Sequence, residues 1–120
     1  MHKILLTGSS GFIGSNILSS FSKDYKFYIL VRKKPLKRHL KNKNIKVIQF
    51  KNYNSLNSKL KKIKVNTVIH CATHYIKNHK FEDIEKLCNS NLMFGNIILE
   101  NLANLKASKF INFSTVWEDG

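Results

Sequence analysis

The chain has 120 residues, with 21 Lys and Arg against 7 Asp and Glu, a formal charge of +14 and 42% hydrophobic residues. This length fits one domain with a buried core, and the ordinary apolar content argues against a disordered chain. No apolar run reaches the roughly 18 residues of a membrane-spanning helix, so no membrane partner is expected.

Short apolar runs alternate with amphipathic stretches along the chain. Strands are predicted at residues 3–7, 26–31, 46–50, 66–71 and 109–113. Helices are predicted at 12–21, over a short stretch from Ser55 as its cap to Ile63, and at 81–105. Residues 32–45 have no predicted element. Strands that are apolar on both faces, separated by helices, indicate an α/β fold with a doubly wound parallel sheet, about five strands and flanking helices.

The basic residues are unevenly distributed. Thirteen of them lie between Arg32 and Lys64, with no acidic residue among them, and such an excess is typical of nucleic-acid-binding proteins. However, Lys, Asn and Ile together make up 46 of the 120 residues, and all three have A- and T-rich codons. The basic stretch also lacks the aromatic and arginine pattern that stacks on bases. We therefore attribute the lysines mainly to base composition and expect no nucleic-acid partner.

Histidines and cysteines do not form a convincing metal site. Cys71 and Cys88 cannot build a disulfide framework or a zinc knuckle, which favours reduced thiols in a cytoplasmic protein. His70 lies in a predicted strand beside apolar residues, where a structural histidine is the expected role. A closed set of three or four zinc ligands is not apparent, so no metal is predicted.

The segment from Thr7 to Gly14, TGSSGFIG, joins the first predicted strand to the first predicted helix. Gly8 suits the positive φ of a tight turn, Gly11 lets a pyrophosphate approach the backbone, and Gly14 allows close packing of helix on strand. The helix N-terminus supplies amide N–H groups and partial positive charge to phosphates. A purely structural glycine turn is the alternative. The predicted cofactor-binding residues of this turn are Gly8, Ser10, Gly11, Phe12, Ile13 and Gly14.

These residues carry a family resemblance. TGSSGFIGS resembles the extended short-chain dehydrogenase/reductases of the NAD-dependent epimerase/dehydratase type. Three later segments also resemble that family in register: residues 68–73 (VIHCAT), 91–100 (NLMFGNIILE) and 110–115 (FINFST). The resemblance covers the whole chain and implies a Rossmann-type domain over residues 1–120 that binds NAD(P). It further implies cofactor contacts by Cys71, Ala72, Thr73 and Asn91. It implies a catalytic hydroxyl at Thr115 or, second, Ser114, although both could simply cap the end of the last strand.

The preferred cofactor is predicted from the end of the second strand. NAD sites generally place Asp or Glu there, whereas this chain has Arg32, eighteen residues past Gly14. A guanidinium can bind a 2′-phosphate through two hydrogen bonds, and a carboxylate would repel it. We therefore predict NADP over NAD, the alternative being that Arg32 belongs to the Lys-rich surface. After the third strand, Asn52 is the candidate adenine contact, because the family's Asp is replaced there by Lys51-Asn52.

The catalytic pair of the family is missing from this chain. No tyrosine is followed four residues later by lysine, and the family normally continues well beyond this length. The resemblance therefore implies the cofactor-binding portion of a nucleotide-sugar epimerase, dehydratase or reductase that transfers hydride at a sugar carbon, inactive as this chain. It also implies a nucleotide-sugar substrate, a homodimer for the full-length form and a role in polysaccharide synthesis. The alternatives are a non-catalytic NAD(P)-sensing module and a basic nucleic-acid binder on the same fold.

Overall fold

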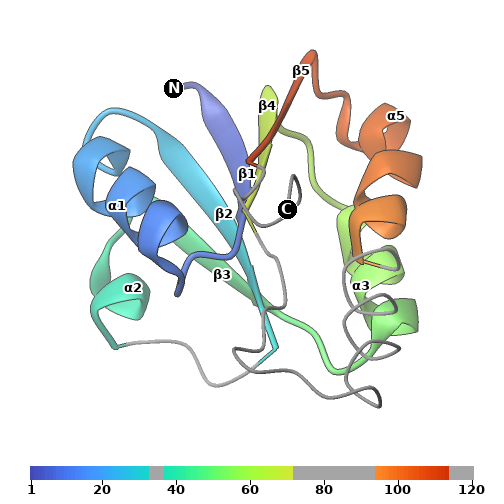
Figure 1. Cartoon of the computed structure of the whole chain (residues 1–120), viewed down its shortest axis with the longest axis horizontal. Coiled ribbons are helices and arrows are strands. Elements are labelled where there is room, and N and C mark those ends of the chain that lie inside the picture. The colour runs from blue at the N-terminus through green and yellow to red at the C-terminus, as the bar shows by residue number, and fades with distance from the viewer. Residues whose placement is uncertain (33–36, 72–93, 114–120) are drawn as a thin grey trace, which may run out of the picture.

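The computed structural model describes residues 1–32, 37–71 and 94–113. Residues 94–100 are helical and lead into the last helix (Figure 1). The five strands all pair in parallel, in the order β3-β2-β1-β4-β5, which confirms the predicted doubly wound sheet. The elements in chain order are β1 Lys3–Thr7, α1 Phe12–Phe21, β2 Lys26–Val31, α2 Lys37–Lys41, β3 Ile45–Gln49, α3 Tyr53–Leu60, β4 Thr67–His70, α5 Leu102–Leu105 and β5 Lys109–Asn112.

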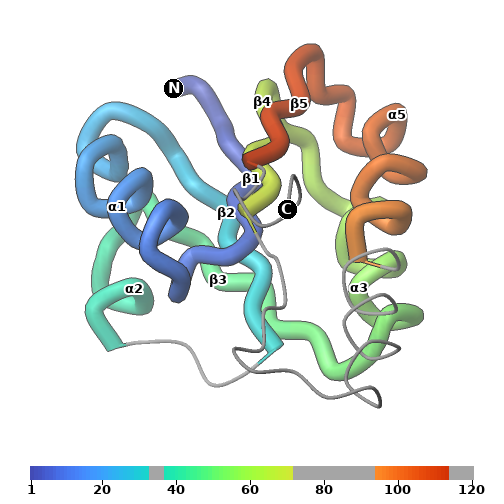
Figure 2. Tube along the Cα trace, in the orientation of Figure 1, coloured from blue at the N-terminus to red at the C-terminus, as the bar shows by residue number. Residues whose placement is uncertain are grey.

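Helices cover both faces of this sheet. The tube in Figure 2 shows α1 and α2 on one side, and α3 and α5 on the other. Leu5 and Leu6 of β1 are both fully buried, although neighbouring side chains on a strand point to opposite faces. Leu5 belongs to the core beneath α3 and α5, and Leu6 belongs to the core that includes Leu18 of α1. This burial on both faces explains why the strands read as continuous apolar runs.

The order of the strands reverses at β1. Thr7, the last residue of β1, pairs with Leu30 of β2 on one side and with His70 of β4 on the other. The chain passes from β1 to β2 on one side and reaches β4 on the other, which makes the carboxyl end of β1 a topological switch point. The turn that begins at Gly8 therefore lies where open α/β sheets bind their ligands.

Two expectations about helices are wrong. Residues 37–41 form α2 within a stretch expected to be irregular, and its His39 is only 7% exposed. Five residues are too few to show a helical period, so tertiary packing rather than sequence pattern determines this helix. Helix α3 begins at Tyr53 rather than after Ser55, because Asn52 is its cap. The Asn52 side chain accepts from Ser55 N, and the Ser55 side chain completes a reciprocal capping box.

The predicted helix at 81–105 is confirmed only in part. Residues 81–93 lie outside the described residues, and the helix after residue 94 is interrupted at Asn101, which is followed by α5. The Asn101 side chain is 2% exposed and donates to Ile97 O and to Asn57 Oδ1. An asparagine that bonds the preceding turn competes with regular helix geometry, which accounts for the break.

The observed β3, β4 and β5 differ from the predicted strands by one residue at one or both ends.

Some apolar side chains of the described elements are exposed. Phe12 and Phe21 of α1 are 84% and 46% exposed, whereas Leu18 is buried. Ile111 of β5 pairs with buried Ile69 of β4 but is itself 43% exposed.

No helix within the described ranges is long and apolar enough to cross a membrane.

Candidate functional site

The turn after β1 has the backbone geometry predicted for it. Gly8 adopts φ 73°, in the left-handed region that favours glycine, and its carbonyl accepts a hydrogen bond from Gly11 N at 3.1 Å. Gly11 then caps α1 in an extended conformation, with φ −78° and ψ 173°. Ser15 N donates to Gly11 O at 2.9 Å, which closes the first turn of the helix. The chain therefore reverses from strand to helix within four residues.

The structure assigns different physical reasons to the three glycines. Gly8 needs its positive φ. A Cβ on Gly14 would lie 2.0 Å from Gly8 O, so α1 can approach β1 only if position 14 has no side chain. Neither reason applies to Gly11, because its φ suits any residue and a Cβ there would meet Gly8 O at an ordinary 3.5 Å. Among the described residues, packing gives no reason for glycine at position 11, whereas the close approach of a phosphate to the backbone would give one.

The N-terminus of α1 suits an anion. Within the part of the chain that the structure describes, no side chain caps its first amide groups, and its first turn contains no acidic residue. The amides that precede the first helical hydrogen bond carry the partial positive charge of the helix end. The Phe12 side chain, at the first position of α1, is 84% exposed and is therefore not packed into the core. A pyrophosphate therefore fits this turn in charge, in hydrogen-bonding capacity and in the space left at Gly11.

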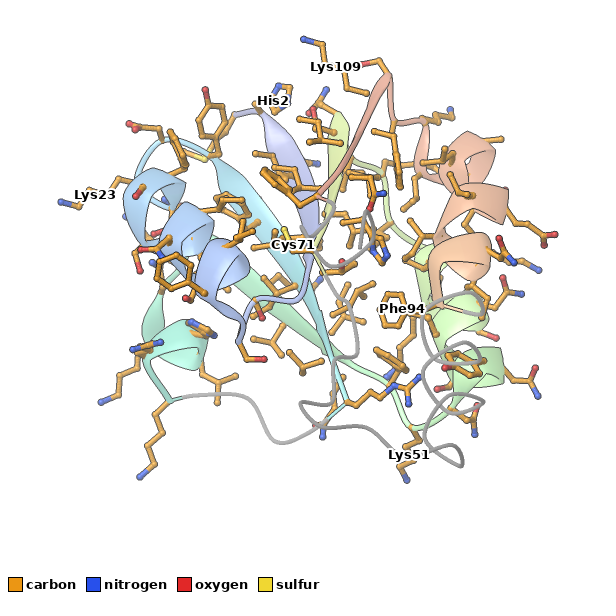
Figure 3. The ribbon with its side chains drawn as sticks, viewed as in Figure 1. His2, Lys23, Lys51, Cys71, Phe94 and Lys109 are labelled. Atoms are coloured by element: carbon orange, nitrogen blue, oxygen red, sulfur yellow. The ribbon has the colours of Figure 1, made fainter. Side chains whose placement is uncertain are left out.

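A hydrogen-bonded cluster joins the carboxyl ends of three strands below this turn. Thr7 Oγ1 and His70 Nδ1 share a buried hydrogen bond of 2.7 Å. Cys71 N donates to Thr7 Oγ1 at 3.0 Å, which brings the predicted Cys71 beside the glycine turn, as Figure 3 shows near the centre of the molecule. Phe113 N donates to His70 O at 3.1 Å and ties β5 to β4. These contacts fix the ends of β1, β4 and β5 relative to one another.

His70 is enclosed by aromatic rings. Its ring centre lies 5.6 Å from that of Phe94 and 6.4 Å from that of Phe110, and the side chain is 8% exposed. Figure 3 shows Phe94 between the sheet and the helices. Burial lowers the pKa of His70, so the imidazole is neutral at physiological pH. Burial raises the pKa of the Cys71 thiol, which argues against a thiolate nucleophile there. The structural role predicted for His70 agrees with these contacts.

Stability should fall as the pH is lowered below about 6.5, the unperturbed histidine value. Burial lowers the pKa of His70, and burial together with Arg38 lowers the pKa of His39. The unfolded chain therefore binds more protons than the folded chain at pH values below about 6.5. Each group contributes a slope of up to about 1.4 kcal/mol per pH unit between its folded and unfolded pKa values. The free energy of unfolding, measured with urea, should be lower at pH 5.5 than at pH 7.5. The His70→Gln variant should show a smaller difference between the two pH values. An unchanged pH dependence in that variant would contradict this assignment.

The other predicted contacts lie at the same edge of the sheet. Arg32 directly follows β2, and its guanidinium Cζ lies 4.8 Å from the ring centre of Tyr53 and 5.5 Å from that of Phe50. Asn52 Oδ1 accepts from Ser55 N at 2.9 Å, so this oxygen has a structural role as the cap of α3. Contact of Arg32 or Asn52 with a cofactor stays a prediction.

The sequence prediction located part of this site and missed another part. Two participants were missed: Thr7, which bridges β1 and β4, and Tyr53, which contacts Arg32. Thr7 is recognisable as the polar residue that ends an otherwise apolar strand. Tyr53 can be found only by placing the ends of β2 and β3 side by side. The predicted residues Ala72, Thr73, Asn91, Ser114 and Thr115 lie outside the described residues.

Comparisons with known proteins agree with the geometry. The profile of the NAD dependent epimerase/dehydratase family matches residues 4–119. A dTDP-D-glucose 4,6-dehydratase of Dictyostelium discoideum is 32% identical over 126 residues, covering 96% of this chain and 29% of that protein. A CDP-abequose synthase of Yersinia pseudotuberculosis is 28% identical, covering 97% of this chain and 40% of that protein. The fold is similar to that of the enzyme WbmG of Bordetella bronchiseptica, solved in complex with NAD, with a TM-score of 0.79 and 20% identity over 97% of this chain and 38% of that one.

Proposed function

Because the chain belongs to the NAD dependent epimerase/dehydratase family, we propose that it is the dinucleotide-binding portion of an enzyme that transfers hydride at a carbon of a nucleotide-activated sugar. The chain spans 29% and 40% of the length of the two relatives compared by sequence, so the activity of the whole protein is part of this proposal. Both relatives are named for nucleotide-linked sugars, which supports that substrate class. A cytoplasmic location and a homodimeric assembly are also proposed.

The observation that carries the proposal is Gly11. Gly8 and Gly14 have reasons within the chain to be glycine, whereas Gly11 has an unstrained backbone and room for a Cβ. Its place at the uncapped N-terminus of α1, at the reversal of strand order, is where a bound pyrophosphate would approach the backbone.

The cofactor, when bound, accepts or supplies the hydride. The residues of this chain would bind and orient it. The amide groups at the start of α1 would hold the pyrophosphate, and the Thr7, His70 and Cys71 cluster would keep the ends of β1 and β4 fixed beside it. Ser114 and Thr115 are proposed as hydroxyl donors to the reacting sugar oxygen, with Thr115 preferred.

We further propose that the preferred cofactor is NADP. Arg32 is the residue at the end of β2, where a carboxylate would select NAD, and its planar guanidinium can bind a 2′-phosphate through two N–H groups. No acidic residue occurs between Arg32 and Lys64 to offset this charge.

Titration calorimetry of the full chain with NADP and NAD tests this proposal. We expect NADP to bind more tightly, and Arg32→Gln to lower NADP affinity by about tenfold to a hundredfold, the value of a charge-assisted hydrogen bond, with NAD affinity nearly unchanged. Lys43→Gln removes a positive charge before β3, at the opposite edge of the sheet, and serves as the control. Equal affinities for NADP and NAD in the unaltered chain would overturn the cofactor preference, and absence of binding to both would overturn the proposed function.

A further inference from the structure

The guanidinium of Arg32 is held against two aromatic rings. Its Cζ lies 4.8 Å from the ring centre of Tyr53 and 5.5 Å from that of Phe50. Phe50 is 1% exposed and belongs to the core beneath α3, whereas Tyr53 is half-buried at the edge of that core. Arg32 itself is exposed. An exposed arginine thus lies against one buried and one half-buried aromatic ring.

The register of the sheet brings these residues together. Val31 pairs with Gln49 across β2 and β3, and Phe50 N donates to Val31 O at 3.0 Å. Residues 32 and 50 are consequently neighbours just past the carboxyl ends of two adjacent strands. Tyr53 follows as the first residue of α3, and the capping box of Asn52 and Ser55 fixes where that helix starts. The backbone position of Tyr53 is therefore fixed by the helix cap, and its side chain packs against the core beneath α3.

Stacking on a ring uses the face of a guanidinium and leaves its edge available. All five N–H groups of arginine lie in the plane of the group, so a guanidinium on an aromatic face can still offer a pair of parallel donors to a phosphate. Holding that plane in advance reduces the rotamer freedom lost when an anion binds. An arginine restrained in this way binds a phosphate more tightly than the same arginine free in solvent.

We propose that Tyr53 is a positioning residue for cofactor selectivity, which orients Arg32 toward the 2′-phosphate of NADP. This inference rests on the proposed function and on the preference for NADP. Tyr53 acts through Arg32, and its ring rather than its hydroxyl is the part required. Discrimination between nucleotides with and without a 2′-phosphate then depends on both residues together.

The test measures binding of adenosine 2′,5′-bisphosphate and adenosine 5′-monophosphate to the full chain by titration calorimetry. Tyr53→Leu should lower the affinity for the bisphosphate about two- to fivefold, the range of an exposed cation–π contact. The affinity for the monophosphate should stay unchanged. Tyr53→Phe should bind both as the unaltered chain does, because it keeps the ring. Tyr25→Leu is the matched control, since Tyr25 is also half-buried and in contact with other rings, but lies before β2 at the opposite edge of the sheet.

A double-mutant cycle shows whether Tyr53 acts through Arg32. In the Arg32→Gln background, Tyr53→Leu should have no further effect on the ratio of the two affinities. If Arg32→Gln lowers the ratio but Tyr53→Leu does not, the positioning role is wrong while the NADP preference stands. An equal weakening of both nucleotides by Tyr53→Leu would also overturn it, because that pattern indicates a structural role. Failure of the unaltered chain to bind either nucleotide would overturn the proposed function itself, and the inference with it.

Discussion

Substitution of Gly14 by alanine should strongly destabilise the domain. The added Cβ would lie 2.0 Å from the carbonyl oxygen of Gly8 and 2.7 Å from its carbonyl carbon. These are backbone atoms of a turn that has positive φ at Gly8 and is closed by the hydrogen bond from Gly11 N to Gly8 O, so they cannot move aside as a flexible side chain could. Relief requires α1 to shift away from β1, which separates Leu18 from the core that it shares with Leu6.

We expect a loss of about 3 kcal/mol or more in the free energy of unfolding, at or above the upper end of ordinary overpacking. Urea denaturation followed by circular dichroism measures it. Gly95→Ala is the matched control, because Gly95 also lies in a helix but a Cβ there would meet His70 Nε2 at an ordinary 3.8 Å. That variant should be as stable as the unaltered chain or more stable, since alanine favours the helix by up to about 1 kcal/mol. Equal midpoints for Gly14→Ala and the unaltered chain would show that the close approach of α1 to β1 is not required.

The parts of the fold that the sequence predicted are those determined by local pattern. The bounds of β1, α1 and β2 agree with the structure because apolar runs buried on both faces, and glycines at fixed spacing, mark their ends within a few residues. The glycine turn was predictable for the same reason, since the positive φ of Gly8 and the close packing at Gly14 both require glycine. The parallel sheet followed from the alternation of such strands with helices.

The remaining features depend on contacts between residues far apart in sequence. Helix α2 is too short to show a period, and its His39 is buried by the packing of neighbouring elements. At the break, the buried Asn101 side chain also donates to Asn57, 44 residues earlier. The contact of Arg32 with Tyr53 depends on the pairing of Val31 with Gln49, which no local pattern reveals. Sequence reasoning therefore located the glycine turn but not the contact between Tyr53 and Arg32.

Substitution of Gly11 by alanine should separate binding from folding. The backbone of Gly11 is extended, with φ −78° and ψ 173°, and an added Cβ would meet Gly8 O at 3.5 Å, an ordinary contact. We expect the free energy of unfolding to change by less than about 0.5 kcal/mol, because the lower unfolded-state entropy of alanine offsets its weaker preference for the helix cap. Urea denaturation checks this part of the prediction.

The same methyl group should nevertheless weaken binding of the dinucleotide. It occupies the space through which a phosphate would approach the amides of α1, so at least one charge-assisted hydrogen bond is lengthened or lost. The expected result is a decrease in NADP affinity of about tenfold to a hundredfold in titration calorimetry, with a similar decrease for NAD, since both share the pyrophosphate. Gly95→Ala, which adds the same methyl group outside the turn, should bind both as the unaltered chain does. Full affinity in a folded Gly11→Ala variant would mean that the phosphates do not approach the chain at this position.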